Sequence, residues 1–464
     1  MESRTAVLTD TNQTQHIKAR TGRTAESGIP GGIAKRVLAG HRRLIIGLDG
    51  TWNTPDQQDR DQQCPSNVVK LLRAMDSHNN GVEQIKYYDA GVGTDGFVDK
   101  LWGGVAGRGL FGNMRQAYVW LLENYRLGDQ LFMFGFSRGA FAVRSLVAML
   151  DLCGIPKRVD YSYDFMEVAS EAARIYREPI KTRQKRMARE FRNRFHAQDA
   201  TVTMLGVWDT VGAMGLPTQG LLGKLTRSQH QFHNTRLSKN VRHAYQALAM
   251  NEMRRPFEPA LWRGKCPKEV ETVEQVWFPG VHANIGGGYA DAGLSDIALE
   301  WMLEKAQQHD LALRPGYLIN RVDPNPFAEM RDPIRPLYRS LMIGRPRTRG
   351  IGSGALGEAI DISAARRWLA PSRPEAPPAN FLVNSQRARN FQRRAGEYAY
   401  SEHVIPGAAL EAEPKPQPKS QPQPQPKSEP NSEPKSEIEQ LNSQSQHIHA
   451  KSHIPARMPW SDIS

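Results

Sequence analysis

The chain has 464 residues, of which 39% are hydrophobic, and a formal net charge of +13. No uninterrupted apolar run approaches the roughly 18 residues that span a bilayer, and residues 1–20 lack the apolar core of a signal peptide. We therefore expect a cytoplasmic protein in the producing cell, and any export would follow a signal-peptide-independent route. The cysteines number only 3 and are scattered, which argues against a disulfide framework or a cysteine metal cluster.

The polar ends and the apolar middle suggest four regions. Residues 1–40 show no sustained periodicity and are predicted to form a disordered arm. Residues 41–345 are predicted to form the main folded domain, and residues 346–410 an extension of it. The tail 411–464 is rich in Pro, Gln, Lys, Ser and Glu, a low-complexity composition that favours an extended chain.

Strand and helix patterns alternate through the middle of the chain. Apolar runs of strand length occur at 42–50, 83–91, 130–137, 201–209 and 274–282. Helical patterns occur at 66–76 with Ser66 as the N-cap, and at 113–126, 138–150, 235–253 and 295–308. This alternation predicts a doubly wound, mainly parallel sheet with helices on both faces.

The run FGFSRGA contains a G-x-S-x-G pattern between a predicted strand and a predicted helix. In such a turn, small residues such as Gly135 and Gly139 let the chain fold back, and Ser137 is held above the sheet edge. The backbone N–H of Arg138 would then point at an anionic intermediate. The pattern predicts a nucleophilic serine; the alternative is a tight strand-to-helix turn without chemistry.

A nucleophilic serine needs a base and an orienting acid. In α/β-hydrolases the acid precedes the histidine in the chain, each after a later strand. Asp209 ends the strand pattern at 201–209, and His282 follows the one at 274–282. Asp209 could instead be a cap and His282 an ordinary loop histidine, but the ordered trio favours a catalytic role for both.

The first strand ends in LDGTWN, the expected place for a second oxyanion donor. Gly50 or Thr51 could offer that N–H, and Asp49 would orient the loop. A phosphatase of the haloacid type would need an aspartate two residues before Asp49, and Gly47 stands there.

Four stretches, LDGTWN, FGFSRGA, GVWDTVGA and WFPGVHANIGGGY, together resemble the α/β-hydrolase family typified by type VI secretion phospholipase effectors. Three further stretches also fit this family: YYDAGVGT, the GD pair before the strand predicted at 130–137, and the run HAYQALAMNEMRRPFEPALW. The resemblance extends from about Arg43 to about Gln308 and weakens towards Ile343. It implies an ester hydrolase with a triad of Ser137, Asp209 and His282.

The resemblance further implies phospholipid as the leading ester substrate, no cofactor and no metal, and a secretion apparatus or an immunity protein as partners. Two features depart from the family. The residue two after the histidine is commonly acidic, whereas this chain has Asn284. The low-complexity tail stands in place of the membrane-anchoring region of the best-known effectors, so delivery is less firmly implied than hydrolysis.

Residues 174–196 are densely basic and form a predicted cap helix. Side chains with helical spacing form an apolar stripe on it: Ile180, Gln184, Met187, Phe191 and Phe195. One hypothesis is that its cations contact an anionic membrane and deliver lipid to Ser137; these are Arg183, Lys185, Arg186, Arg189 and Arg192. The alternative is a packed helix with a solvated basic face.

Two further classes of protein compete with an ester hydrolase. The charge would suit a nucleic-acid-binding protein, but the basic cluster has no interleaved aromatic pattern and no recognised fold signature, so no nucleic acid is expected. A catalytically silent α/β-hydrolase scaffold that binds membranes or nucleic acid is the main alternative. A binding module has no need of all three triad residues, which favours the enzyme.

Overall fold

The computed structural model describes residues 42–50, 53–79, 81–91, 105–157, 164–212, 236–332, 334, 347–369 and 457–459. The predicted N-terminal arm 1–40, Thr51 and all of the tail from 411 except 457–459 lie outside these ranges. So do residues 335–346, which include the predicted boundary between the catalytic domain and its extension. The four-region division therefore stays a prediction.

The described strands build one sheet in the order β11-β10-β9-β8-β7-β6-β1-β5-β4. Their bounds are β1 Arg43–Leu48, β4 His78–Asn79, β5 Val82–Asp89, β6 Gln130–Phe136, β7 Val202–Trp208, β8 Val241–Ala249, β9 Thr272–Phe278, β10 Glu358–Asp361 and β11 Arg457–Pro459. From β10 to β5 all neighbours are parallel, and β4 and β11 add antiparallel edges. A separate hairpin pairs β2 Gln58–Asp59 with β3 Gln62–Gln63.

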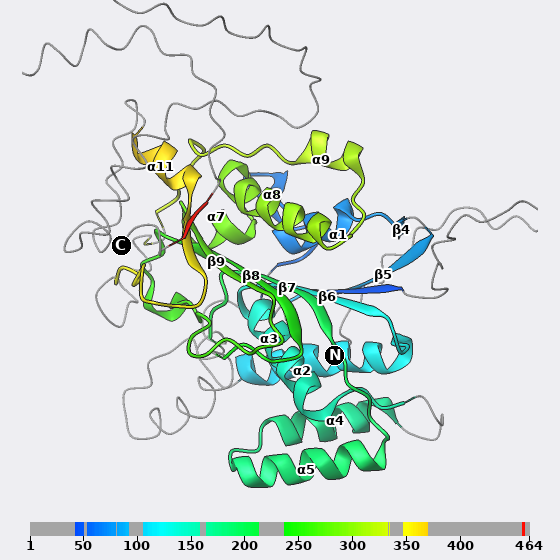
Figure 1. The fold of residues 1–464 in the computed structure, drawn as a ribbon. Coiled ribbons are helices and arrows are strands. Elements are labelled where there is room, and N and C mark those ends of the chain that lie inside the picture. Colours follow the sequence, from blue (N-terminus) through cyan, green and yellow to red (C-terminus); the bar gives the residue numbers. More distant parts are fainter. Residues whose placement is uncertain are drawn as a thin grey trace, which may run out of the picture.

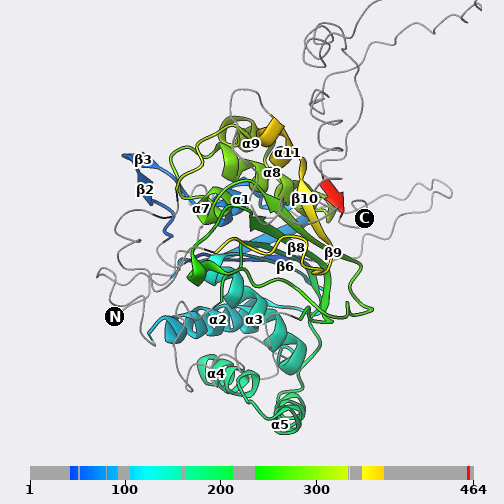
Figure 2. The ribbon, with the colours of Figure 1, turned by 90° about the vertical axis from the view of Figure 1, so that its left-hand side faces the viewer.

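Helices cover both faces of the sheet (Figures 1 and 2). One face carries α2 (Val105–Asn124) and α3 (Ser137–Cys153), and the other carries α1 (Asn67–Ala74), α7 (His282–Gly286) and α8 (Gly293–Gln308). Alternate side chains of one strand enter the two cores: Leu44 and Ile46 belong to the α2–α3 core and Ile45 to the α1–α8 core. The predicted doubly wound α/β fold is confirmed.

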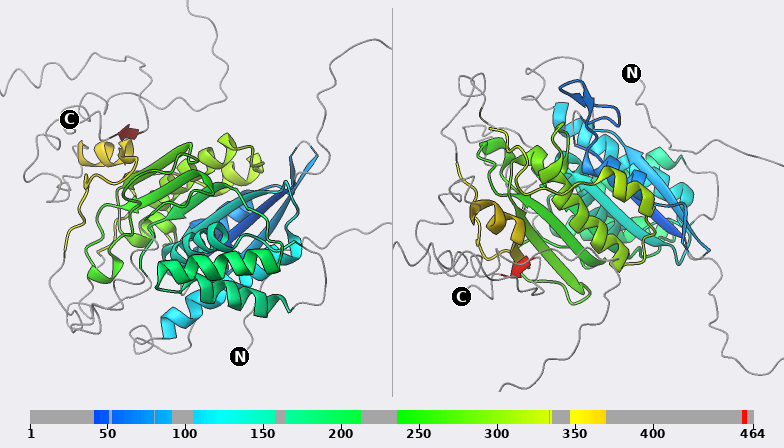
Figure 3. Two further views of the ribbon diagram at one scale, coloured as in Figure 1. Left: turned by 60° about the horizontal axis from the view of Figure 1, so that its bottom comes forward. Right: turned by 90° about the horizontal axis from the view of Figure 1, so that it is seen from above.

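The α1–α8 face also carries α9 (Pro315–Arg321), which lies near α8 when the sheet is viewed from above (Figure 3). The predicted cap at Ser66 is present, because its side chain accepts a hydrogen bond from the backbone N–H of Val69 at 3.3 Å. No helix of the described ranges is long and apolar enough to cross a bilayer.

The helix predicted over 235–253 was wrong. Residues Val241–Ala249 form β8, which lies between β7 and β9 and is buried over most of its length. Alanine, leucine and glutamine favour a helix when packing does not decide. Here both faces of the strand are covered and both edges are paired, so burial and ladder hydrogen bonds outweigh local preference.

The strand order reverses at β1, which lies between β6 and β5. The chain passes from β1 to β5 on one side and later to β6 on the other, which separates the loops that follow β1 and β6. In open α/β sheets, ligands bind at the carboxyl ends of the strands next to such a reversal. Asp49 and Ser137 directly follow β1 and β6, so both lie at this position.

The sheet continues beyond residue 346 through β10, which pairs in parallel with β9 and leads into α11 (Ile362–Leu369). The last strand, β11, pairs antiparallel with β10 through Met458 and its neighbours. The described part of the predicted extension therefore belongs to the same sheet as the rest of the domain.

Candidate active site

Ser137 begins α3 directly after β6 and has a left-handed backbone, with φ of 57°. Such a conformation is costly for a residue other than glycine and persists only where the surroundings enforce it. The two flanking glycines make room for the turn. A Cβ on Gly139 would lie 2.2 Å from the carbonyl oxygen of Leu48, and one on Gly135 would lie 2.8 Å from Cα of Ala140. The sequence-predicted turn thus needs glycine at both places.

The structure brings Ser137, His282 and Asp209 together. Oγ of Ser137 lies 2.7 Å from Nε2 of His282, and Nδ1 of His282 lies 2.5 Å from Oδ2 of Asp209. The three follow β6, β9 and β7, whose parallel carboxyl ends meet at one edge of the sheet. All three side chains are buried, with relative exposures of 6% for Ser137, 6% for His282 and 0% for Asp209.

Asp209 accepts four hydrogen bonds. Besides His282, it accepts one from the backbone N–H of Ala249 at 3.0 Å and two from the guanidinium of Arg349, at 2.6 and 3.0 Å. Burial alone would raise the pKa of this carboxyl, but Arg349 and His282 hold it well below its ordinary value. Asp209 is therefore a carboxylate around neutral pH.

His282 is held by ring contacts and by its backbone. Its imidazole packs against the tilted ring of Phe136 and makes an edge-to-face contact with Phe257, with centroid distances of 4.7 and 4.8 Å. Its N–H donates to the buried Glu252 at 3.2 Å, and Glu252 is paired with Arg254 at 2.7 Å. Burial lowers the pKa of His282, against the opposing effect of Asp209, so the imidazole is neutral at pH 7 and Nε2 is free to accept a proton.

Of the predicted oxyanion donors, the N–H of Arg138 is available and that of Gly50 is not. Arg138 is in the first turn of α3, where backbone N–H groups have no acceptor within the helix. The Gly50 loop does approach the serine, since a Cβ on Gly50 would lie 3.1 Å from Cβ of Ser137. The N–H of Gly50, however, already donates to Oδ1 of Asp49 at 2.8 Å, so its expected role as an oxyanion donor is not supported. Thr51 lies outside the described residues.

Asp49 has the orienting contacts expected of it. Its carboxylate accepts hydrogen bonds from Asn53 at 3.1 Å and Tyr88 at 3.1 Å, and from the hydroxyl of Ser66. Burial raises the pKa of Asp49, although these hydrogen bonds and that of Gly50 oppose the rise. The side chain ties the loop after β1 to α1 and β5 beside the serine.

Asn284, the departure in the histidine loop, has a capping role. Its Oδ1 accepts from the N–H of Val281 at 3.3 Å, and its Nδ2 donates to the carbonyl of Glu329 at 3.1 Å. The amide thus supports the short helix α7 that begins at His282. An acidic side chain there could not donate to the Glu329 carbonyl. Within the described ranges, no group of His, Cys, Asp or Glu side chains is arranged to hold a metal ion.

The basic segment does not form the predicted single helix. It divides into the end of α4 (Phe165–Tyr176) and α5 (Lys181–Arg194), which lie beyond α2 and α3 on the side away from the sheet (Figure 2). The predicted apolar stripe is partly correct: Gln184, Phe191 and Phe195 are buried, but Ile180 is 56% exposed.

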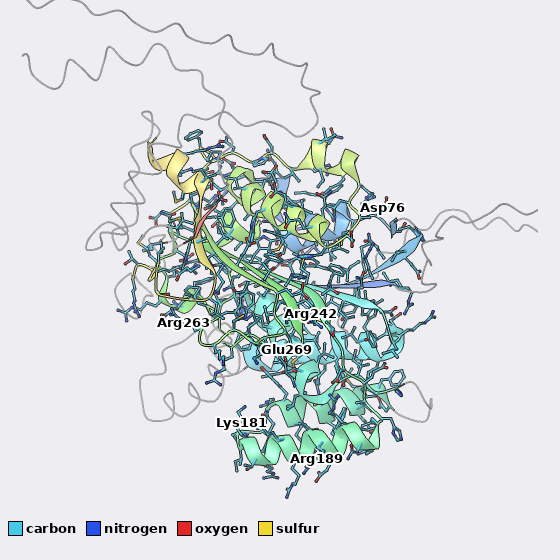
Figure 4. All side chains as sticks on the ribbon, viewed as in Figure 1. Asp76, Lys181, Arg189, Arg242, Arg263 and Glu269 are labelled. Carbon is cyan, nitrogen blue, oxygen red and sulfur yellow. The ribbon has the colours of Figure 1, made fainter. Side chains whose placement is uncertain are left out.

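The predicted membrane-contacting cations fall into two sets. Arg183 and Arg186 pair with glutamates, at 3.4 and 3.8 Å. Lys185, Arg189 and Arg192 line a groove of about 830 Å³, hereafter the basic groove, whose other walls are the last turns of α3 and the residues just before β8. Figure 4 shows Arg189 and Lys181 on α5 at the outer side of the molecule.

The basic groove is remote from Ser137. Its α3 wall begins at Ala148, which is roughly 16 Å along the helix from Ser137 at 1.5 Å per residue. It therefore lies towards the amino ends of the strands, whereas the serine lies at their carboxyl ends. Direct delivery of lipid from this segment to Ser137, as hypothesised from the sequence, does not agree with this placement.

Sequence reasoning missed several residues of the site. Glu252, Arg254 and Phe257 lie within the run HAYQALAMNEMRRPFEPALW, which was noted as part of a family pattern but given no role. Arg349 had no signal, because a lone arginine far beyond the histidine in the sequence has no pattern to mark it.

A family model described as "T6SS, Phospholipase effector Tle1-like, catalytic domain" matches residues 42–305, more than half of the chain. The chain belongs to this family. The matched residues of this Tle1-like domain include Ser137, Asp209 and His282, whereas Arg349 lies beyond the end of the match. The family resemblance stated from sequence is confirmed.

One curated relative is the uncharacterized protein YEL023C of Saccharomyces cerevisiae, 25% identical over 239 residues, which cover 47% of this chain and 32% of the yeast protein. The Tle1-like chain therefore spans about a third of that relative's length.

Similar solved structures include an uncharacterized protein from Pseudomonas aeruginosa, with 17% identity, a TM-score of 0.39 and coverage of 80% of this chain and 60% of that one. The Tle1 effector bound to the VgrG spike has 20% identity, a TM-score of 0.31 and coverage of 55% and 52%. A Thermogutta terrifontis esterase has 13% identity, a TM-score of 0.31 and coverage of 60% and 86%. At such TM-scores these overlaps say nothing about function.

Proposed function

We propose that this chain is a serine ester hydrolase that cleaves phospholipids through an acyl-enzyme. The observation that carries the proposal is the hydrogen-bonded series Ser137–His282–Asp209, with distances of 2.7 and 2.5 Å, at the carboxyl edge of the sheet. The same order and contacts are those of a nucleophile, a base and an orienting acid. Membership in a phospholipase effector family supports the ester class.

In the first step, Nε2 of the neutral His282 takes the proton of Ser137 as Oγ attacks the ester carbonyl. Asp209 holds the Nδ1 proton and stabilises the imidazolium that forms. The N–H of Arg138 at the start of α3 stabilises the oxyanion, with help from the helix dipole. His282 then returns the proton to the leaving alcohol.

In the second step, His282 takes a proton from water, and the resulting hydroxide attacks the acyl group on Ser137. As the tetrahedral intermediate collapses, His282 gives that proton to Oγ of Ser137, which releases the fatty acid and regenerates the serine hydroxyl. The rings of Phe136 and Phe257 keep the imidazole in place through both steps. The site needs no metal for this chemistry.

Family membership suggests a partner and a location for this chain. We propose that the chain is made in the cytoplasm, leaves through a type VI apparatus without a signal peptide, and is matched by an immunity protein in the producing cell. The solved Tle1 effector is described as bound to the VgrG spike, and we extend that kind of partner to this chain. Loss of export in a strain lacking the spike would test this.

The hydrolase is tested on phospholipid vesicles and on short p-nitrophenyl esters, with the wild type, Ser137→Ala and the control Ser145→Ala. Ser145 is also a buried serine of α3, and it lies about two turns beyond Ser137. We expect activity in the wild type and the control and none in Ser137→Ala. A wild type inactive on both substrates would favour a silent scaffold, and a preference for short esters would exclude phospholipid as the main substrate.

A further inference from the structure

Arg349 is the feature of the site that neither the sequence pattern nor the family match contains. It lies beyond residue 305, where the match ends, and its side chain is buried at 5% relative exposure. Both terminal nitrogens bond the Asp209 carboxylate, at 2.6 and 3.0 Å, in the forked geometry that guanidinium and carboxylate prefer. The same nitrogens donate to the carbonyls of Ala249 at 2.8 Å and Phe257 at 2.5 Å.

The loop that carries Arg349 is fixed along the site. The N–H of Arg347 donates to the carbonyl of Met253 at 3.0 Å, and that of Leu356 donates to the carbonyl of Trp262 at 3.0 Å. Glu358 accepts from the N–H of Gly352 at 2.9 Å and from the indole of Trp277 at 2.8 Å. Since Trp277 belongs to β9, which leads to His282, one strand supports both the base and the loop of Arg349.

The charges around His282 cancel in pairs. Asp209 faces Nδ1 and is paired with Arg349, while Glu252 faces the backbone N–H and is paired with Arg254. A proton added to His282 therefore creates a net positive charge in a buried site. Without Arg349, the Asp209 carboxylate would offset that charge alone, and the protonated imidazole would be more stable.

We propose that Arg349 is a positioning residue, which fixes the Asp209 carboxylate and offsets its charge. His282 therefore stays unprotonated, and able to act as a base, down to a lower pH than it would without Arg349. This inference rests on the proposed function, because it assigns Arg349 to the same reaction. It also extends the catalytic unit of this chain past the family-matched region, as far as the loop before β10.

The test compares Arg349→Gln with Arg347→Gln, a matched control on the same loop. Arg347 is exposed and pairs with Glu258 at 3.8 Å, with side-chain exposures of 69% for each. In Arg349→Gln we expect kcat to fall about 10²-fold, because the acid is no longer held in place. The acidic limb of kcat/KM against pH should also move up by about one pH unit. The control should match the wild type.

A purely structural role would lower activity at every pH without moving the acidic limb, and that result would overturn the proposal. Arg349→Lys keeps the charge without the fork, so we expect a lower kcat with the limb close to its wild-type position. If Arg349→Gln does not fold, as judged by thermal melting, Arg349→Lys still decides: a wild-type kcat in that variant would overturn the positioning role.

A second readout does not depend on activity. Titration of the His282 imidazole by NMR, in Ser137→Ala and with His282→Gln for assignment, should show a higher pKa once Arg349→Gln is added. If the wild type lacks esterase activity but Arg349→Gln still raises the pKa of His282, only the proposed function is wrong. If the pKa of His282 does not change, the proposed role of Arg349 is wrong.

Discussion

The carboxyl edge of the sheet and the basic groove hold positive charge in opposite ways. At the edge, Arg349 and Arg254 are bonded to the fully buried carboxylates of Asp209 and Glu252. In the groove, Lys185 and Arg189 are exposed and form no ion pair with any residue that the structure describes.

This difference between buried ion pairs and exposed cations indicates where a single substitution should have a large effect on activity or stability. Removing one partner of a buried ion pair leaves a charge without solvent or counter-charge, which is strongly unfavourable. An exposed cation is solvated and screened by salt, so its removal changes little by itself. We therefore expect large, individual effects at the carboxyl edge and small, additive effects in the groove.

The largest expected effect is that of His282→Ala. If serine and base act as a unit, losing either should lower turnover by roughly a millionfold, because the hydroxyl is then a poor nucleophile. Steady-state hydrolysis of a soluble ester measures this, with the exposed His196, just after α5, replaced by alanine as the control. Near-normal turnover in His282→Ala would remove the assignment of the base.

Asp209→Asn should lower turnover by roughly 10⁴-fold, because the amide favours the wrong imidazole tautomer. It also leaves the buried Arg349 without its carboxylate. The comparison with the groove is direct, because Asp199 is the exposed partner of Arg192 at 2.5 Å, with 91% side-chain exposure. Asp199→Asn should leave turnover unchanged, and equal losses in the two variants would break the comparison.

Gly139→Ala tests whether the strand-to-helix turn around Ser137 tolerates a side chain at Gly139. The added Cβ would lie 2.2 Å from the Leu48 carbonyl oxygen and 2.4 Å from that of Asp49, so backbone must move. We expect a loss of about 3 kcal/mol in the free energy of unfolding, together with lost activity. In Gly112→Ala, where the Cβ meets nothing within 4 Å, we expect a gain of up to about 1 kcal/mol.

Denaturant unfolding of both glycine variants measures this prediction. Gly112 lies inside α2, where an added Cβ meets no neighbour, so it reports the helix preference of alanine alone. A Gly139→Ala variant as stable as the wild type would mean that the turn is less crowded than these contacts indicate.

The smallest effect is expected in the basic groove. Lys185→Gln with Arg189→Gln should weaken binding to vesicles of anionic phospholipid by about fivefold for each cation, more at low salt. Turnover of a soluble ester should not change, because the groove is remote from Ser137. The control is Arg183→Gln with Arg186→Gln, whose cations are ion-paired. Equal losses in both pairs, or none in the first, would exclude the groove as the membrane contact.

The sequence by itself determined the features that depend on local pattern. The strand-turn-helix around Ser137 is written in adjacent residues, since only glycine fits at Gly135 and Gly139. The positions of Asp209 and His282 followed from strand ends, because parallel strands present their carboxyl ends at one edge. The alternation of apolar strands and helices was enough to give the doubly wound sheet.

Tertiary structure decided what depends on contacts between distant segments. Val241–Ala249 has a helical composition but forms a central strand, because its neighbours cover both faces and pair both edges. The N–H of Gly50 is taken by Asp49, a contact that the loop sequence does not reveal. Arg349 reaches Asp209 across 140 residues only because β10 joins β9 in the sheet. Burial and charge pairing give that arginine its place, and neither leaves a periodic trace in the sequence.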